Sequence, residues 1–261
     1  SDDERPLFHP LRLTNVDATV SDGRIDARGA IVLEERARQL AEFTAEHNVG
    51  EGVGVARVTA ADITFSPALQ PYDITEQARG LVDGVTGGIS LNTEIVWTRD
   101  VITGQGRARL NDISLATATI PIVHGVRGEI FFDDLFALTT PPGQRIQIAT
   151  LNPGVEVHNG RVRFQLLPDQ RVAIEQADFD FASGTLSMQP TTIGLGEDET
   201  RFELTLRDVE AAELLRTLNV SDLTATGQPE GSFPLLLTRR SAFVNGGVVR
   251  AQGDGGLISY T

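Results

Sequence analysis

The 261-residue sequence predicts a mainly β fold, and residues 128–167 show most clearly why. Within 161–167 apolar and polar residues alternate, so that Val162, Phe164 and Leu166 share one face of a strand. Successive side chains of a strand point to opposite faces, whereas a helix would need a period of 3.6 residues, which is absent here. Gly-containing turns recur between such runs along most of the chain. The pattern is typical of a sheet with one polar and one apolar face.

The first half of the chain contains seven expected strands and one ambiguous segment. Residues 33–47 have helix spacing and good helix formers, yet 40–47 also fits a strand. A strong turn signal at 21–23 joins the first two strands. The expected strands are Leu11–Val20, Arg24–Leu33, Gly54–Ala60, Asp62–Phe65, Ile89–Arg99, Ile102–Leu110 and Ile113–Ile120.

The second half of the chain shows the same alternation of apolar and polar residues in a further series of expected strands. Val155–Val157 leads into His158–Gly160, where Asn-Gly predicts a tight hairpin before the strand at 162–166. The other expected strands are Gly128–Phe132, Arg145–Leu151, Arg171–Phe181, Thr185–Gln189, Arg201–Arg207, Leu223–Gly227, Gly231–Thr238, Phe243–Gln252 and Gly256–Tyr260.

Two short α-helices are expected, near 73–82 and 208–218. Asp73 can cap the first helix, and Glu76 stands three residues later, as in a capping box. Asp208 is the expected cap of the second helix, which presents an apolar stripe that includes Leu214.

Composition excludes several classes of function. The formal net charge is −14 and every basic residue is Arg, which argues against nucleic acid as a partner because phosphates require a basic surface. Cysteine is absent, so the chain has no disulfide, thiolate metal site or cysteine nucleophile. No run of 18 apolar residues is present to span a bilayer, and the acidic start is not a signal peptide.

No pattern of residues predicts catalysis, a metal or any other cofactor. The four histidines, His9, His47, His124 and His158, lack the spacing of ligand pairs, and no Gly-x-Ser-x-Gly motif occurs. Asp133 and Asp134 are adjacent and so point to opposite faces of a strand, which favours a polar strand end. The acidic stretch Glu197–Glu199 lacks the alternating ligands of a calcium loop.

The apolar face is the strongest functional signal. It is rich in Phe, which offers apolar surface without a polar group and suits acyl chains or a dry core equally. We expect Phe164, Phe181, Phe202 and Leu204 to remain accessible if they line a groove. The candidate lining residues are Val162, Phe164, Leu166, Phe179, Phe181, Leu186, Met188, Phe202, Leu204 and Leu206.

Several segments together resemble the YdbH family of the AsmA-like superfamily, related to TamB. The similarity covers most of the chain and is weakest before residue 50. It is carried by the order of the segments more than by any one of them. The segments are Phe132-Asp133-Asp134-Leu135, Leu138–Gln144, Leu151-Asn152-Pro153-Gly154, Thr64–Pro71, Ala182–Leu186, Gly246–Val249 and Gly255–Tyr260.

The resemblance implies a strongly curved, antiparallel-rich sheet that forms a U-shaped groove, as in a β-taco, with a β-sandwich as the alternative. It favours a strand at 40–47. It also implies one elongated domain over 1–261, an excised piece of a larger periplasmic protein anchored in the inner membrane outside this stretch. The terminal strands near Leu11–Val20 and Leu257–Tyr260 are then expected to be unpaired edges.

The function that the resemblance implies is a non-enzymatic lipid conduit, carrying phospholipid acyl chains between the inner and outer membranes. An outer-membrane lipoprotein is a candidate partner. One alternative is a structural or interaction β-sandwich. Another is small-anion transport, since the family has also been labelled dicarboxylate transport, for which Arg161/Arg163 and Arg107/Arg109 are the only hints.

Overall fold

The computed structural model describes residues 8–117, 120, 122–153, 155–238, 242–253 and 255–260, and within them sixteen strands form one open antiparallel sheet. Its strands are hydrogen-bonded in the order β1 to β11, followed by β13, β15 and β16. β12 pairs with β10, and β17 pairs with β15. The expected mainly β fold is therefore confirmed, and the strands do not divide into the two sheets of a sandwich.

The strands of the first half are β1 (Leu11–Ser21), β2 (Arg24–Leu33), β3 (Arg38–Asn48), β4 (Val53–Phe65), β5 (Asp83–Trp97), β6 (Ile102–Ala116), β7 (Ile122–Phe132) and β8 (Gln144–Asn152). Those of the second half are β9 (Val157–Leu167), β10 (Arg171–Phe181), β11 (Gly184–Met188), β12 (Thr191–Gly194), β13 (Glu199–Arg207), β14 (Leu223–Ala225), β15 (Pro229–Thr238), β16 (Ala242–Val244), β17 (Val248–Ala251) and β18 (Ile258–Tyr260). The helical elements are the 3₁₀ turns η1 (Glu34–Arg36), η2 (Pro71–Asp73) and η3 (Glu76–Ala78) and the helix α1 (Ala211–Thr217).

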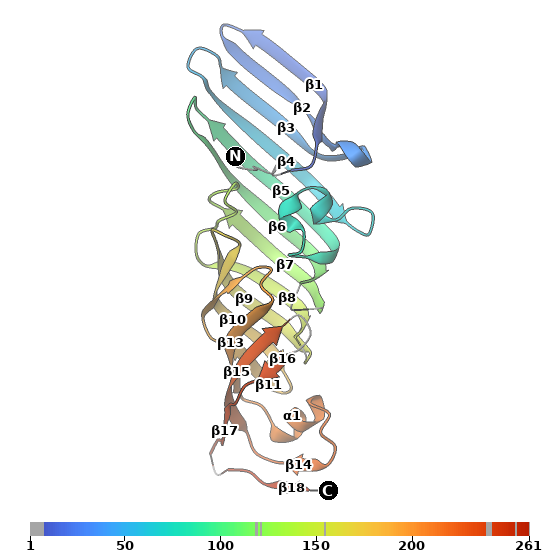
Figure 1. Ribbon diagram of the computed structural model, residues 1–261, viewed down its shortest axis with the longest axis vertical. Helices are drawn as coiled ribbons and strands as arrows, with labels where there is room; N and C mark the ends of the chain where they lie inside the picture. The colour runs from blue at the N-terminus through green and yellow to red at the C-terminus, as the bar shows by residue number, and fades with distance from the viewer. Residues whose placement is uncertain are drawn as a thin grey trace.

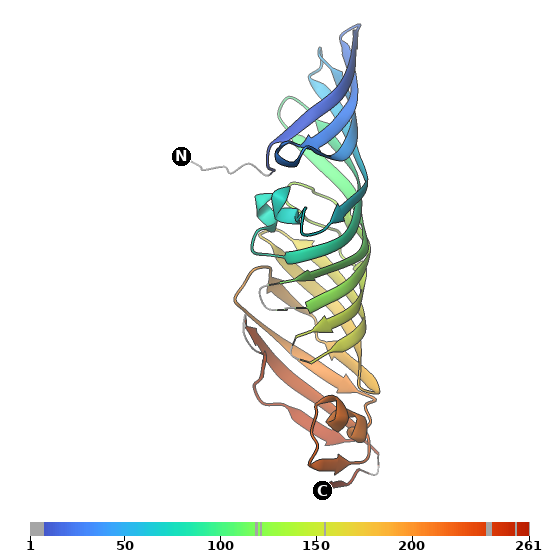
Figure 2. The ribbon, with the colours of Figure 1, turned by 90° about the vertical axis from the view of Figure 1, so that its right-hand side faces the viewer.

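The sheet is long in the direction across its strands, and it twists along that length (Figure 1). Short connections between antiparallel strands place most neighbours in sequence next to each other in space. The edge-on view shows the strands inclined to the long axis, with η2 and η3 on one side of the sheet (Figure 2). α1 and the separate two-stranded sheet of β14 and β18 lie at the C-terminal end.

Three expected breaks in strands are bulges or irregularities instead, the first at Ala61, where Gly54–Ala60 and Asp62–Phe65 join in β4. Residues 113–116 continue β6, because Asp112 takes a φ of 57° and shifts the register without ending the strand. The predicted hairpin at His158–Gly160 is also wrong: β9 runs through it, and only Asn159 has a positive φ, of 49°. A type I′ turn needs two such residues, so a lone left-handed Asn produces a bulge opposite Phe179.

Only one of the two expected α-helices forms. Residues 73–82 contain the single turn η3 and the end of η2, because Asp73 accepts a hydrogen bond from the backbone of Gln70 and so caps the preceding turn. Thr75 then takes an extended conformation, which interrupts the helix. The second helix, α1, is shorter than 208–218, since Asp208 has a φ of 58° and ends β13.

Residues 40–47 form part of β3, which confirms the strand at this ambiguous position. β1 forms one end of the sheet as expected, and its apolar side chains are largely exposed, Val20 to 71%. β18, in the expected segment Leu257–Tyr260, also pairs on one side and leaves the other edge free, but its partner is β14 in a separate two-stranded sheet, so it does not end the main sheet. Part of the expected strand Phe243–Gln252 bends at 245–247, so that β16 and β17 both pair with β15.

Leu206 should contribute far more to stability than an exposed leucine on the same sheet. Leu206 is 2% exposed and lies in the main apolar cluster, whereas Leu13 is 55% exposed. Replacing Leu206 by Ala should lower the free energy of unfolding by about 2–5 kcal/mol, because a buried cavity is left behind. Leu13→Ala serves as the control and should change it by less than about 0.5 kcal/mol. Equal denaturant midpoints for the two variants would contradict this placement of Leu206.

Candidate functional site

One face of the sheet carries two clusters of apolar side chains. The first cluster lies on β9 to β13 and the second on β5 to β7. The buried members of the first are Val157, Val162, Phe164, Val172, Ala177, Phe179, Phe181, Leu186, Leu206 and Val209. Those of the second are Val85, Ile113, Val123 and Val126.

The two clusters meet on β8. Ile146, Ile148 and Leu151 pack against both of them, so the apolar face is continuous from β5 to β13. The residues that alternate with Ile146 and Ile148 in sequence, such as Arg145 and Gln147, are exposed on the other face. We call the apolar side the inner face. Its continuity follows from the alternation within each strand and the aligned register of neighbouring strands.

Nine of the ten predicted lining residues lie in or against the first cluster. Cross-strand pairs bring them together: Phe179 with Leu186, Leu186 with Leu206, and Met188 with Leu204. Phe202 lies apart from the cluster, opposite Leu235 on β15.

The expected accessibility of these residues holds for only some of them. Phe164 and Phe181 are each 5% exposed, because side chains of neighbouring strands pack over them. Phe202 and Leu204 are half-buried, as are Leu166 and Met188. Any apolar ligand on the inner face would therefore meet the half-buried residues first.

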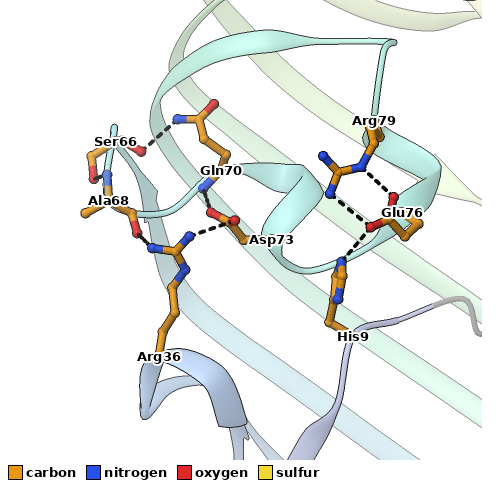
Figure 3. A network of polar contacts seen from close by, with 8 residues as sticks. All are labelled: His9, Arg36, Ser66, Ala68, Gln70, Asp73, Glu76 and Arg79. Carbon is orange, nitrogen blue, oxygen red and sulfur yellow. Dashed lines mark hydrogen bonds and ion pairs between the residues drawn. The ribbon is translucent and has the colours of Figure 1, made fainter.

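Residues 66–82, which connect β4 to β5, cross over the inner face, and we call them the strap (Figure 1). Val82 packs against the second cluster, and Leu69 is completely buried. A network of polar contacts fixes the strap (Figure 3). In it, Arg36 of η1 donates hydrogen bonds to the carbonyl oxygen of Ala68 (2.7 Å) and to Asp73 Oδ1 (2.7 Å). The connection between β2 and β3 thus supports the connection between β4 and β5.

The second half of the network joins the strap to the start of the described chain. His9 Nε2 lies 3.2 Å from Glu76 Oε1, and the backbone N–H of His9 donates to the carbonyl oxygen of Ile74. Arg79 donates two hydrogen bonds to the same carboxylate, of 2.6 and 2.9 Å. These bonds are the chief reason that the pKa of Glu76 lies below its ordinary value.

Gln70 holds the base of the strap through a buried side chain. The last pair of β4 and β5 joins Phe65 to Gly87, which leaves Val85 without a partner on β4. The Gln70 amide supplies one: Nε2 donates to Val85 O and Oε1 accepts from Val85 N, both at 2.8 Å. Gln70 is only 5% exposed. Its side chain therefore replaces a strand as the hydrogen-bonding partner.

The polar face offers little to a small anion at the predicted arginine pairs. Arg161 Nη2 lies 3.6 Å from Asp180 Oδ1, and Arg163 Nε lies 2.9 Å from Glu175 Oε2. Arg107 and Arg109 share Glu129, at 3.8 and 3.2 Å. Each pair already faces carboxylates on neighbouring strands, which is the arrangement of a solvated outer face.

Three of the acidic and histidine side chains considered from the sequence make local structural contacts. Asp134 Oδ1 accepts from the backbone N–H groups of Phe136 and Ala137, and Asp133 accepts from Thr139. His47 accepts a hydrogen bond from Trp97 Nε1. No group of three potential metal ligands occurs among the described residues, and none of the helices described there is long and apolar enough to cross a membrane.

The strap was not foreseen from the sequence as a functional element. Its residues read as a turn followed by a helix, and Gln70 is a polar residue between Leu69 and Pro71 without a diagnostic motif. The role of the strap becomes clear only from the positions of its partners Val85 and Arg36 in the folded chain.

The apolar inner face and its long open sheet agree with the one comparison that identifies the chain. A family model described as YdbH-like, intermembrane phospholipid transport protein YdbH, matches residues 5–261. The chain belongs to the YdbH-like family. No curated protein and no solved structure matches it significantly. The resemblance seen in the sequence is thereby confirmed, and the family's description connects this chain to phospholipid transport between membranes.

Removing the Gln70 amide should loosen the strap in this YdbH-like chain. Gln70→Ala would leave the buried N–H and C=O of Val85 unpaired, which costs about 1–3 kcal/mol for each group. We expect a lower free energy of unfolding and faster hydrogen exchange at the Val85 amide. Gln105→Ala, at an exposed position on β6, is the control. Equal protection of Val85 in both variants would show that Gln70 does not hold the strap.

Proposed function

We propose that this chain is a periplasmic, non-enzymatic lipid conduit module, which carries phospholipid acyl chains along the inner face of its sheet. The observation that carries the proposal is the continuity of the apolar face through Ile146, Ile148 and Leu151. Membership in a family of intermembrane phospholipid transport proteins supports the choice of lipid. The proposal includes the curling of the sheet around its inner face into a U-shaped groove.

The mechanism is partition rather than chemistry. Each methylene group kept out of water contributes about 0.8 kcal/mol, so an acyl chain is retained wherever apolar surface is offered. A face that is apolar over many strands presents similar surface from one strand to the next. A lipid can then move along it without a large free-energy barrier, while its headgroup stays in water.

Along the face, the acyl chain contacts the half-buried residues. Phe202 and Leu204 lie on β13 with intermediate exposure, next to the buried cluster that contains Leu206. Phe164 and Phe181 are closed off by neighbouring side chains in the cluster against which Leu204 packs. In the parent protein, we propose attachment to the inner membrane through a segment outside residues 1–261, and an outer-membrane lipoprotein as the partner.

The proposal predicts that the chain copurifies with phospholipid when it is produced in bacteria. Phe202→Asp should remove most of that lipid, because an unpaired charge on an apolar surface costs several kcal/mol. Thr205→Asp adds the same charge on the opposite face of β13 and should retain the lipid. Native mass spectrometry and analysis of extracted lipid give the measurement.

A neutral variant guards against loss of lipid through unfolding. Leu204→Asn should also lower the lipid content while thermal unfolding remains cooperative. Lipid-free wild-type protein in repeated preparations would overturn the proposal, and so would equal lipid in folded Phe202→Asp and Thr205→Asp proteins.

A further inference from the structure

The strap connects strands at one row of strand ends, and its residue Leu81 lies near the loops at the other row of strand ends. Successive connections of an antiparallel sheet alternate between its two edges. The connection from β4 to β5 therefore lies at the strand ends opposite those that carry the connections from β7 to β8 and from β9 to β10. Nevertheless, Leu81 of the strap lines the same cavity as residues of both those connections and Leu195. The strap and these loops from the opposite strand ends therefore lie close together over the inner face.

The loop from β7 to β8 covers the inner face from its own side. The backbone N–H of Leu135 donates to the carbonyl oxygen of Gly104 on β6. A Cβ atom added at Gly104 would lie 3.3 Å from Leu135 Cδ1 and 3.3 Å from Phe136 Cε2, so the loop packs closely on this glycine. The strap and this loop approach each other over the sheet, and the cavity lies where they meet.

The cavity has a volume of about 340 Å³, at the small end of the roughly 300–1,000 Å³ typical of ligand sites. Its lining is mostly apolar, with polar groups from η3 and the β9–β10 turn. The lining residues are Gln77, Leu81, Phe136, Ala137, Leu138, Leu166, Leu167, Pro168, Asp169, Gln170, Arg171 and Leu195. Leu166 also packs against the first cluster, so the cavity adjoins the apolar inner face.

Two leucines of the lining are more exposed than a closed core would leave them. Leu138 is 42% exposed and Leu195 is 41% exposed. Leu138 also has a φ of 53°, in the left-handed region that bulky residues rarely adopt. An Asn or Asp would fit this backbone better, and its side chain would suit the exposure. A strained, exposed leucine beside a cavity points to an apolar ligand there.

We propose that this cavity is a seat for a single acyl chain of a phospholipid, where the strap and the opposite loops hold the chain as it enters or leaves the inner face. The inference rests on the proposed lipid function and adds a defined position to it. The small volume suits one chain rather than two. Arg171 and Gln170, at the β9–β10 turn, can bind the polar end of the lipid.

The test uses phosphatidylcholine vesicles that carry a diazirine on one acyl chain, with crosslinked peptides located by mass spectrometry. In the wild-type chain, crosslinks should occur at 77–81, 136–138 and 195. Leu138→Asp should lower crosslinking at these peptides at least about tenfold, because a charge would then face the chain. The variant should remain folded, since the leucine is exposed and Asp tolerates a positive φ.

Leu195→Asp is the second variant and should give the same loss. Leu13→Asp, at an exposed leucine of β1, is the matched control and should leave crosslinking at the cavity unchanged. Crosslinks confined to β13 peptides, or unchanged in Leu138→Asp, would overturn the acyl-chain seat and leave the conduit intact. No crosslinks anywhere on the inner face would overturn the conduit as well.

Discussion

The structure depends on one constraint: a long open sheet has an apolar inner face, and the other sheet among the described residues, β14 with β18, is small and lies at the C-terminal end. Apolar surface left in water is costly, roughly 25 cal/mol for each Å². The chain reduces that exposure with its own side chains at Phe164 and Phe181, and with the strap and the β7–β8 loop elsewhere. What remains half-buried includes Phe202 and Leu204, where we propose that an acyl chain binds.

The strap shows how such a cover can be held without another strand. Gln70 takes the position of a backbone partner for Val85, and Arg36 and His9 tie the strap to neighbouring connections. Apart from Gln70, these polar contacts are partly exposed, so they contribute modestly and orient the strap more than they stabilise the fold. A cover of this kind can yield locally without disturbing the sheet beneath it.

Sequence reasoning succeeded where a local pattern determines the structure. The bounds of β2 and β10 follow from alternation and flanking turns, and the strand at 40–47 is confirmed. It failed where a local signal has two outcomes. A left-handed Asn159 can make a hairpin or a bulge, and Asp73 can cap the turn before it or the helix after it. The choice between them depends on neighbouring strands that are distant in sequence.

By itself, the sequence determined the mainly β fold, the apolar face and the resemblance to the family, because side-chain alternation and turn chemistry act over a few residues. The tertiary structure decided which of the lining residues are buried and which are open. It also brought Leu81 to the loops at the opposite strand ends, where both line one cavity with Leu138. Such contacts join residues more than fifty positions apart, and they arise only once the twisted sheet is assembled.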